Sequence, residues 1–125
     1  MYDRSKGEAK MTFDEYQKQA LTTEMMERPE KISANDPAFV AKVLGLVGEA
    51  GELADKYKKL VRDKDGVILP EDRDSLAKEL GDVLWYLTVV ADYLGLKVED
   101  IAQGNLAKLA SRKARGVQKG SGDDR

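Results

Sequence analysis

Two short stretches of the chain share one pattern of acidic, apolar and glycine residues. Residues 49–54 read Glu-Ala-Gly-Glu-Leu-Ala, and residues 79–84 read Glu-Leu-Gly-Asp-Val-Leu. Residues three apart lie on the same side of a helix, so each stretch places two carboxylates beside an apolar stripe. If the two helices pack together, all four carboxylates converge, and such a cluster suits hard divalent cations and metal-dependent catalysis. The four are Glu49, Glu52, Glu79 and Asp82.

The composition excludes several other chemistries. The chain has 125 residues and contains neither His nor Cys. This removes Ser-His-Asp and Cys-His nucleophiles, disulfides, thiolate zinc sites and the Glu-x-x-His ligands of di-iron bundles. Lys and Arg together number 21 against 23 Asp and Glu, a net charge of −2. No global charge therefore attracts nucleic acid or an anionic membrane, and phosphate binding must be local.

A second interpretation of the acids is a solvated helix face. Two acids three apart most often mean nothing more, although the repetition of the pattern favours a site. Two carboxylates about 4 Å apart repel by about 4 kcal/mol at an effective dielectric constant near 20. We therefore expect the acids either to splay into water or to bind a cation.

Apolar residues recur with helical spacing along most of the chain, and strand signals are nearly absent. A capping box begins at Thr12, Pro37 follows an Asp N-cap, and Asp72 or Asp74 is expected to cap the third helix. The expected helices cover about residues 13–27, 37–62, 72–94 and 98–113. The sequence thus predicts an all-α fold, a compact four-helix bundle with antiparallel central helices.

By length the chain forms one domain, residues 1–115, followed by a glycine- and charge-rich tail at residues 116–125. No apolar signal region begins the chain, and no apolar run approaches the roughly 20 residues of a membrane-spanning helix. We expect a cytoplasmic protein without a membrane or nucleic-acid partner.

Glycines lie inside the expected second and third helices. Each costs roughly 1 kcal/mol relative to alanine in a helix interior, and close approach of another helix, a metal or a ligand is the usual compensation. These glycines are Gly45, Gly48, Gly51 and Gly81.

Longer strings extend around both acidic pairs. They read Leu-Val-Gly-Glu-Ala-Gly-Glu-Leu-Ala-Asp-Lys at residues 46–56 and Glu-Leu-Gly-Asp-Val-Leu-Trp-Tyr-Leu at residues 79–87. Both closely resemble the paired metal motifs of MazG-like nucleotide pyrophosphohydrolases. Residues 105–109 with Arg112 are similar to the family's fourth-helix segment, and residues 120–125 are similar to a tail of its small phage-type members. The resemblance covers most of the chain.

The resemblance implies hydrolysis of an NTP or dNTP to the nucleoside monophosphate and pyrophosphate, with nucleotide-pool cleansing as one biological role. It implies Mg²⁺, with Mn²⁺ as a substitute, bound by Glu49, Glu52, Glu79 and Asp82. A carboxylate not fully occupied by metal would accept a proton from the attacking water, and Glu52 is favoured over Glu49 for this role. The expected substrate-binding residues are Lys56, Tyr86, Asn105, Lys108, Arg112 and Arg125. Lys56 follows Glu52 by one turn, so pairing with that acid is the alternative for this residue.

The resemblance also implies a homodimer or homotetramer, and the apolar residues Trp85, Val89 and Tyr93 are consistent with an interface. The sequence departs from many relatives at Gly48, where they carry an additional acid. The alternative to an enzyme is a non-catalytic helical module that binds a nucleotide, a metal or another protein.

Overall fold

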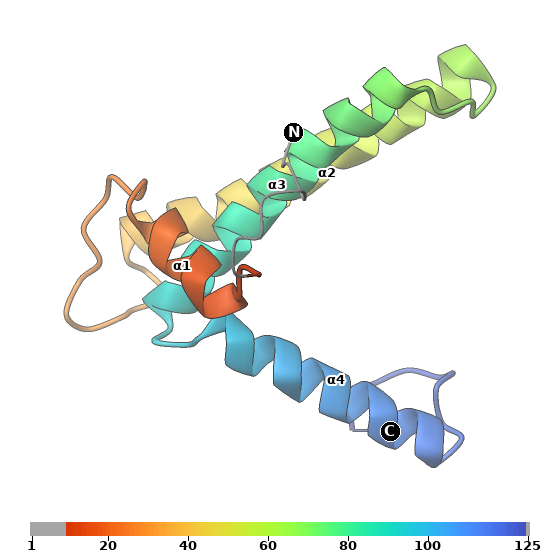
Figure 1. The fold of residues 1–125 in the computed structure, drawn as a ribbon. Coiled ribbons are helices and arrows are strands. Elements are labelled where there is room, and N and C mark those ends of the chain that lie inside the picture. The colour runs from red at the N-terminus through yellow and green to blue at the C-terminus, as the bar shows by residue number, and fades with distance from the viewer. Residues whose placement is uncertain (1–9, 125) are drawn as a thin grey trace.

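The computed structural model describes residues 10–124, and within this range the chain folds into four α-helices without a strand (Figure 1). The all-α prediction is confirmed. The helices are α1 (Phe13–Leu21), α2 (Pro37–Lys64), α3 (Pro70–Tyr93) and α4 (Val98–Ala114).

Helices α2 and α3 form a long antiparallel hairpin that projects as one arm of the molecule (Figure 1). At the start of α2, the Asp36 carboxylate accepts hydrogen bonds from the backbone N–H groups of Ala38 and Phe39. At its end, Asp65 and Gly66 adopt left-handed backbone conformations with φ of 52° and 77°. This conformation ends the helix and returns the chain toward α3.

Helix α3 begins at Pro70, a few residues before the predicted start. Proline is favoured in the first turn because its φ is already helical and its missing N–H is not needed there. The N-cap is Leu69, so Asp72 and Asp74 both lie inside the helix and the prediction that one of them is the N-cap was wrong. The Asp72 carboxylate instead accepts a hydrogen bond from the backbone N–H of Leu69 at 2.9 Å and pairs with Lys64 at 2.8 Å.

Helix α1 ends at Leu21 rather than near residue 27. The Thr22 and Thr23 hydroxyls donate to the carbonyl oxygens of Gln19 and Ala20 at 2.6 and 2.7 Å. Threonine side chains that bond to nearby backbone compete with helix continuation, which explains the early end.

The buried core lies where α1 meets the start of α2 and the end of α3. Phe39 stacks on Tyr93 with ring centroids 5.5 Å apart, and Val89 is fully buried beside them. The Trp85 indole donates to the carbonyl of Ala20 at 3.2 Å. The expectation that Val89 and Tyr93 serve a subunit interface was therefore wrong, because both are fully buried inside their own chain. Trp85 is half-buried against the same core, and its part in an interface stays a prediction.

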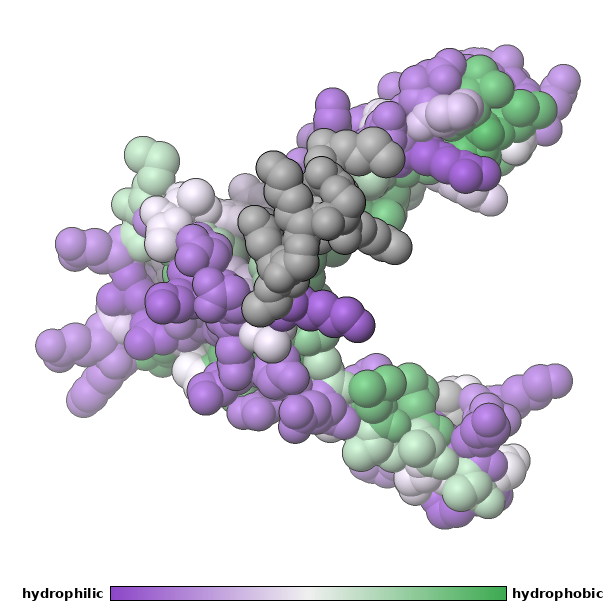
Figure 2. Space-filling model, in the orientation of Figure 1, coloured by the Kyte–Doolittle hydropathy of each residue, from purple (hydrophilic) through white to green (hydrophobic). Residues whose placement is uncertain are grey.

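Helix α4 diverges from the hairpin and is joined to the molecule through α1 (Figure 1). The buried side chain of Gln17 makes this joint, donating to the carbonyl of Leu96 at 3.1 Å and accepting from the N–H of Val98 at 2.9 Å. Figure 2 shows apolar residues gathered on the visible face of α4, and Leu106 and Leu109 are exposed. Among the described helices, none combines the length and apolarity needed to cross a membrane.

Candidate functional site

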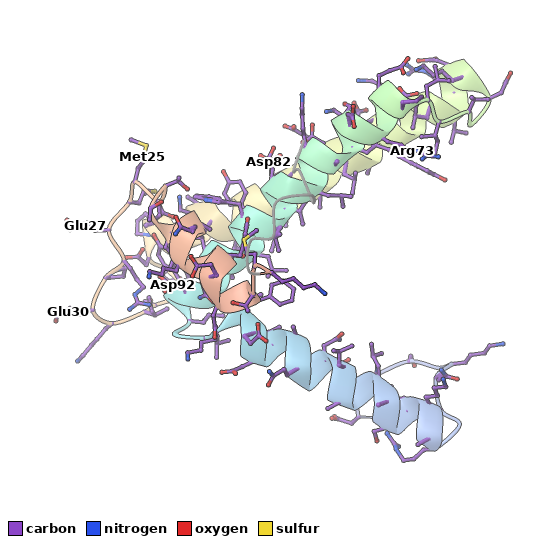
Figure 3. The ribbon with its side chains drawn as sticks, in the orientation of Figure 1. Met25, Glu27, Glu30, Arg73, Asp82 and Asp92 are labelled. Atoms are coloured by element: carbon purple, nitrogen blue, oxygen red, sulfur yellow. The ribbon has the colours of Figure 1, made fainter. Side chains whose placement is uncertain are left out.

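Three of the four predicted carboxylates converge between the two long helices. Glu49 comes from α2, whereas Glu79 and Asp82 lie one turn apart on α3, and one oxygen of each lies within 4.8 Å of the other two. Glu79 is buried, Glu49 is half-buried and Asp82 is exposed, so the cluster opens to solvent at Asp82. Figure 3 labels Asp82 on α3.

The donor set of this cluster fits a hard divalent cation. Burial raises the pKa of Glu49, and the negative charges of Glu52, Asp82 and Glu79 raise it further. Two ligands of one Mg²⁺ lie at most about 4.2 Å apart, because each Mg–O distance is about 2.1 Å. Small side-chain rotations would therefore bring the three carboxylates into one coordination shell. A bound cation would also relieve their mutual repulsion.

Glu52 lies outside this group of three. Its side chain is exposed on α2 and borders a shallow hollow of about 480 Å³ on the helix surface. It is close enough to raise the pKa of Glu49. The hollow is lined by Gly48, Gly51, Glu52, Asp55, Lys56 and Lys59.

Lys56 reaches from α2 across to α3. Its ammonium forms an ion pair with Glu79 and lies 3.5 Å from the carbonyl oxygen of Ser75. Lys56 was predicted to bind substrate. In the structure its ammonium instead contacts Glu79, which is one of the candidate metal ligands.

Tyr86 packs against α2 at Gly45. A Cβ atom at Gly45 would lie 2.1 Å from the Tyr86 ring, so this position accepts only glycine while the ring stays in place. The close approach expected at the glycines is thus confirmed here. At Gly48, Gly51 and Gly81, a Cβ would have no described atom within 4 Å.

Tyr16 of α1 is a neighbour of the cluster that the sequence did not indicate. Burial raises the pKa of its phenol, and the negative charge of Asp82 raises it further. In the sequence, Tyr16 lies on the apolar stripe of its helix, a position that is typical of the core. No local pattern could show that α1 crosses α3 beside the acids.

Two predicted substrate-binding residues of α4 share one anion, Asp123, which lies beyond the end of that helix. Lys108 lies 3.3 Å from a carboxylate oxygen of Asp123. The buried guanidinium of Arg112 donates to the Asp123 carbonyl at 2.7 Å and lies 3.4 Å from its carboxylate. Asn105 is exposed on the same helix. Because α4 diverges from the hairpin, a single chain does not bring these residues to the acids (Figure 1). Arg125 lies outside the described residues.

The fold and the site together define an all-helical protein whose paired helices assemble a carboxylate cluster suited to a divalent metal. Residues 40–117 match the sequence model of a family described as "MazG nucleotide pyrophosphohydrolase domain", and the chain belongs to this family. It is also similar to "Gene 37 protein" of Mycobacterium phage L5, with 58% identity over 82 residues that cover 66% of this chain and 72% of the phage protein. No solved structure matches the chain.

Proposed function

We propose that the protein hydrolyses nucleoside triphosphates, NTP or dNTP, to the monophosphate and pyrophosphate with Mg²⁺. The convergence of Glu49, Glu79 and Asp82 within the matched domain is the observation that carries this proposal. A triphosphate brings several negative charges to its site, so catalysis of its hydrolysis depends on charge neutralisation and positioning.

The carboxylates divide into two roles in this proposal. Glu49, Glu79 and Asp82 would hold the metal, and Mg²⁺ or a substituting Mn²⁺ would neutralise phosphate charge and lower the pKa of a bound water. Glu52 is exposed beside Glu49 and outside the group of three. It therefore keeps a carboxylate free to accept a proton from water attacking the α-phosphorus, as a general base must.

Lys108 and Arg112 are proposed to bind the outer phosphates. Both contact the single residue Asp123, so their cationic groups converge closely enough to share one anionic group. A phosphate carries more charge and more acceptor oxygens than a carboxylate and would compete with Asp123 for them. We further propose that a second copy of the chain brings α4 to the acids, since α4 diverges from them within one chain.

The direct test is a product analysis. The purified protein is incubated with Mg²⁺ and a panel of NTPs and dNTPs, and monophosphate, pyrophosphate and orthophosphate are resolved. We expect equal amounts of monophosphate and pyrophosphate, lost in Asp82→Asn and retained in Glu71→Gln, which removes an exposed acid at the start of α3. Release of orthophosphate with a nucleoside diphosphate would contradict the proposal.

The second candidate is a metal or nucleotide sensor that binds without turnover, and the cluster alone is compatible with it. It predicts that Mg²⁺ raises the melting temperature while no nucleotide in the panel yields product.

A further inference from the structure

Lys56 supplies a positive charge to the most buried carboxylate of the cluster. The Glu79 side chain is 9% exposed and the Lys56 side chain 37% exposed. A carboxylate removed from water is costly unless a cation or several hydrogen bonds compensate it. Lys56 thus supplies the charge compensation that a divalent cation at the cluster would also give Glu79.

The same lysine also borders the hollow on α2 that contains Glu52, Gly48 and Gly51. The two glycines carry no Cβ atom. A Cβ built at either would lie more than 4 Å from every described atom outside the nearby backbone of its own helix, so this surface is open. Apart from Glu79, the Lys56 ammonium has only a long contact of 3.5 Å to the carbonyl of Ser75 among the described atoms. Such a contact is weak, and the four-carbon stem of lysine is flexible. The Ser75 contact therefore does little to hold the ammonium in place, and the ammonium can move to the hollow once another cation compensates Glu79.

We propose that Lys56 is an exchangeable counter-cation: a divalent metal displaces it from Glu79, and the released ammonium then binds a phosphate of the substrate in the hollow. A divalent ion interacts with three carboxylates at once, whereas the ammonium pairs with one of them. A metal bound to Glu79 would also repel the ammonium that pairs with the same carboxylate, and this repulsion favours the exchange. This inference rests on the proposed function and adds a role for a residue that links metal binding to substrate binding.

Metal affinity without nucleotide tests the first half of the exchange. Lys56→Met is compared with Lys59→Met, because Lys59 lines the same hollow but pairs with Asp55 at 2.6 Å. We expect Mn²⁺, titrated by electron paramagnetic resonance of the free ion, to bind Lys56→Met about tenfold more tightly than wild type, since a competing charge is gone. Lys59→Met should bind as wild type does. If Lys56 only positioned Glu79, affinity would fall, by roughly 10- to 100-fold, and the proposal would be overturned.

Thermal stability gives a readout that does not depend on titration of the metal. Without metal, Lys56→Met should melt below wild type because Glu79 loses its cation, and saturating Mn²⁺ should remove most of the difference. Lys56→Gln keeps a hydrogen-bond donor but no charge and should also bind Mn²⁺ more tightly, which covers the case in which the Met variant folds poorly. Equal metal-free melting temperatures for wild type and both variants would contradict the counter-cation role.

Binding of inorganic triphosphate in the presence of Mg²⁺ tests the second half, without dependence on a base or on turnover. Calorimetry should show binding weakened on the order of tenfold in Lys56→Met and little changed in Lys58→Met, because Lys58 pairs with Asp55 at 2.7 Å and does not line the hollow. Unchanged binding in Lys56→Met would overturn the phosphate role. Failure to hydrolyse any nucleotide would instead contradict the proposed function and leave the Mn²⁺ results to decide on the exchange.

Discussion

At the scale of single residues, the site separates carboxylates by their surroundings. Glu79 is buried and ion-paired, Glu49 has its pKa raised by burial and by three acidic neighbours, and Glu52 is exposed outside the group of three. A divalent cation is bound most favourably where several carboxylates repel one another, because it relieves that repulsion. A general base, in contrast, needs a carboxylate oxygen that the metal leaves free. The arrangement therefore predicts different effects for removing Glu52 and for removing a member of the cluster.

Glu52→Gln should lower kcat by roughly 10²- to 10⁴-fold, the range typical of a lost general base, with little change in Mn²⁺ affinity. Asp82→Asn should lower both, because its carboxylate is part of the cluster. Steady-state kinetics and Mn²⁺ titration of both variants separate the two roles. A large loss of Mn²⁺ affinity in Glu52→Gln would place that residue among the metal ligands and contradict the division.

The sequence predicted much of this site because its decisive pattern is local. The spacing of Glu79 and Asp82 puts both on one side of a helix, and the matching pair at Glu49 identifies the helix that faces them. The ion pair of Lys56 and the position of Tyr16 were not predictable in this way. Both depend on how side chains meet across separate helices, which helical periodicity does not specify.

At the scale of elements, two contacts fix how α2 and α3 lie against each other. Near the core, the Tyr86 ring occupies the space left by Gly45. Near the tip, Lys64 pairs with Asp72 at 2.8 Å. Because the carboxylates lie between these two points along the hairpin, a shift of one helix against the other would separate Glu49 from its partners on α3.

Gly45→Ala tests the contact of the glycine with Tyr86. The added Cβ would overlap the ring, so the helices or the ring must move, at a cost of about 1–3 kcal/mol. Gly48→Ala is the matched control: its Cβ meets no described atom within 4 Å, and alanine favours the helix by up to about 1 kcal/mol. Denaturant unfolding should thus show Gly45→Ala less stable than wild type and Gly48→Ala at least as stable. Equal stabilities would show that the contact does not constrain the hairpin.

The ends of the elements were predicted where one residue decides them and missed where residues compete. The Asp36 cap is a strong local signal, and the structure has it. The end of α1 was missed because the apolar pattern continues while Thr22 and Thr23 bond to the backbone instead. Such competition is decided by small energy differences that a periodic pattern does not contain.

At the scale of the whole molecule, the described chain leaves an apolar surface without a partner. Leu106 is 67% exposed and Leu109 is 47% exposed on the diverging helix α4 (Figure 2). Burying such side chains contributes about 1.5–3 kcal/mol each when burial is complete. We propose that α4 packs on a second copy of the chain, which would also carry Lys108 and Arg112 toward its acids.

Leu106→Glu should reduce or abolish self-association, because a charge at the centre of an apolar contact is costly to bury. Ala107→Glu adds the same charge at the next, exposed position, about 100° around the helix, and should leave the assembly intact. Light scattering coupled to size-exclusion chromatography measures the mass of each. A monomeric wild-type protein would contradict the proposal.

A water at the carboxylate cluster is proposed to attack the α-phosphorus of a nucleoside triphosphate. Hydrolysis with Mg²⁺ in heavy-oxygen water, followed by mass spectrometry of both products, tests this step. We expect the label in the nucleoside monophosphate and not in the pyrophosphate. Label in the pyrophosphate would contradict it, because the water would then have attacked the β-phosphorus.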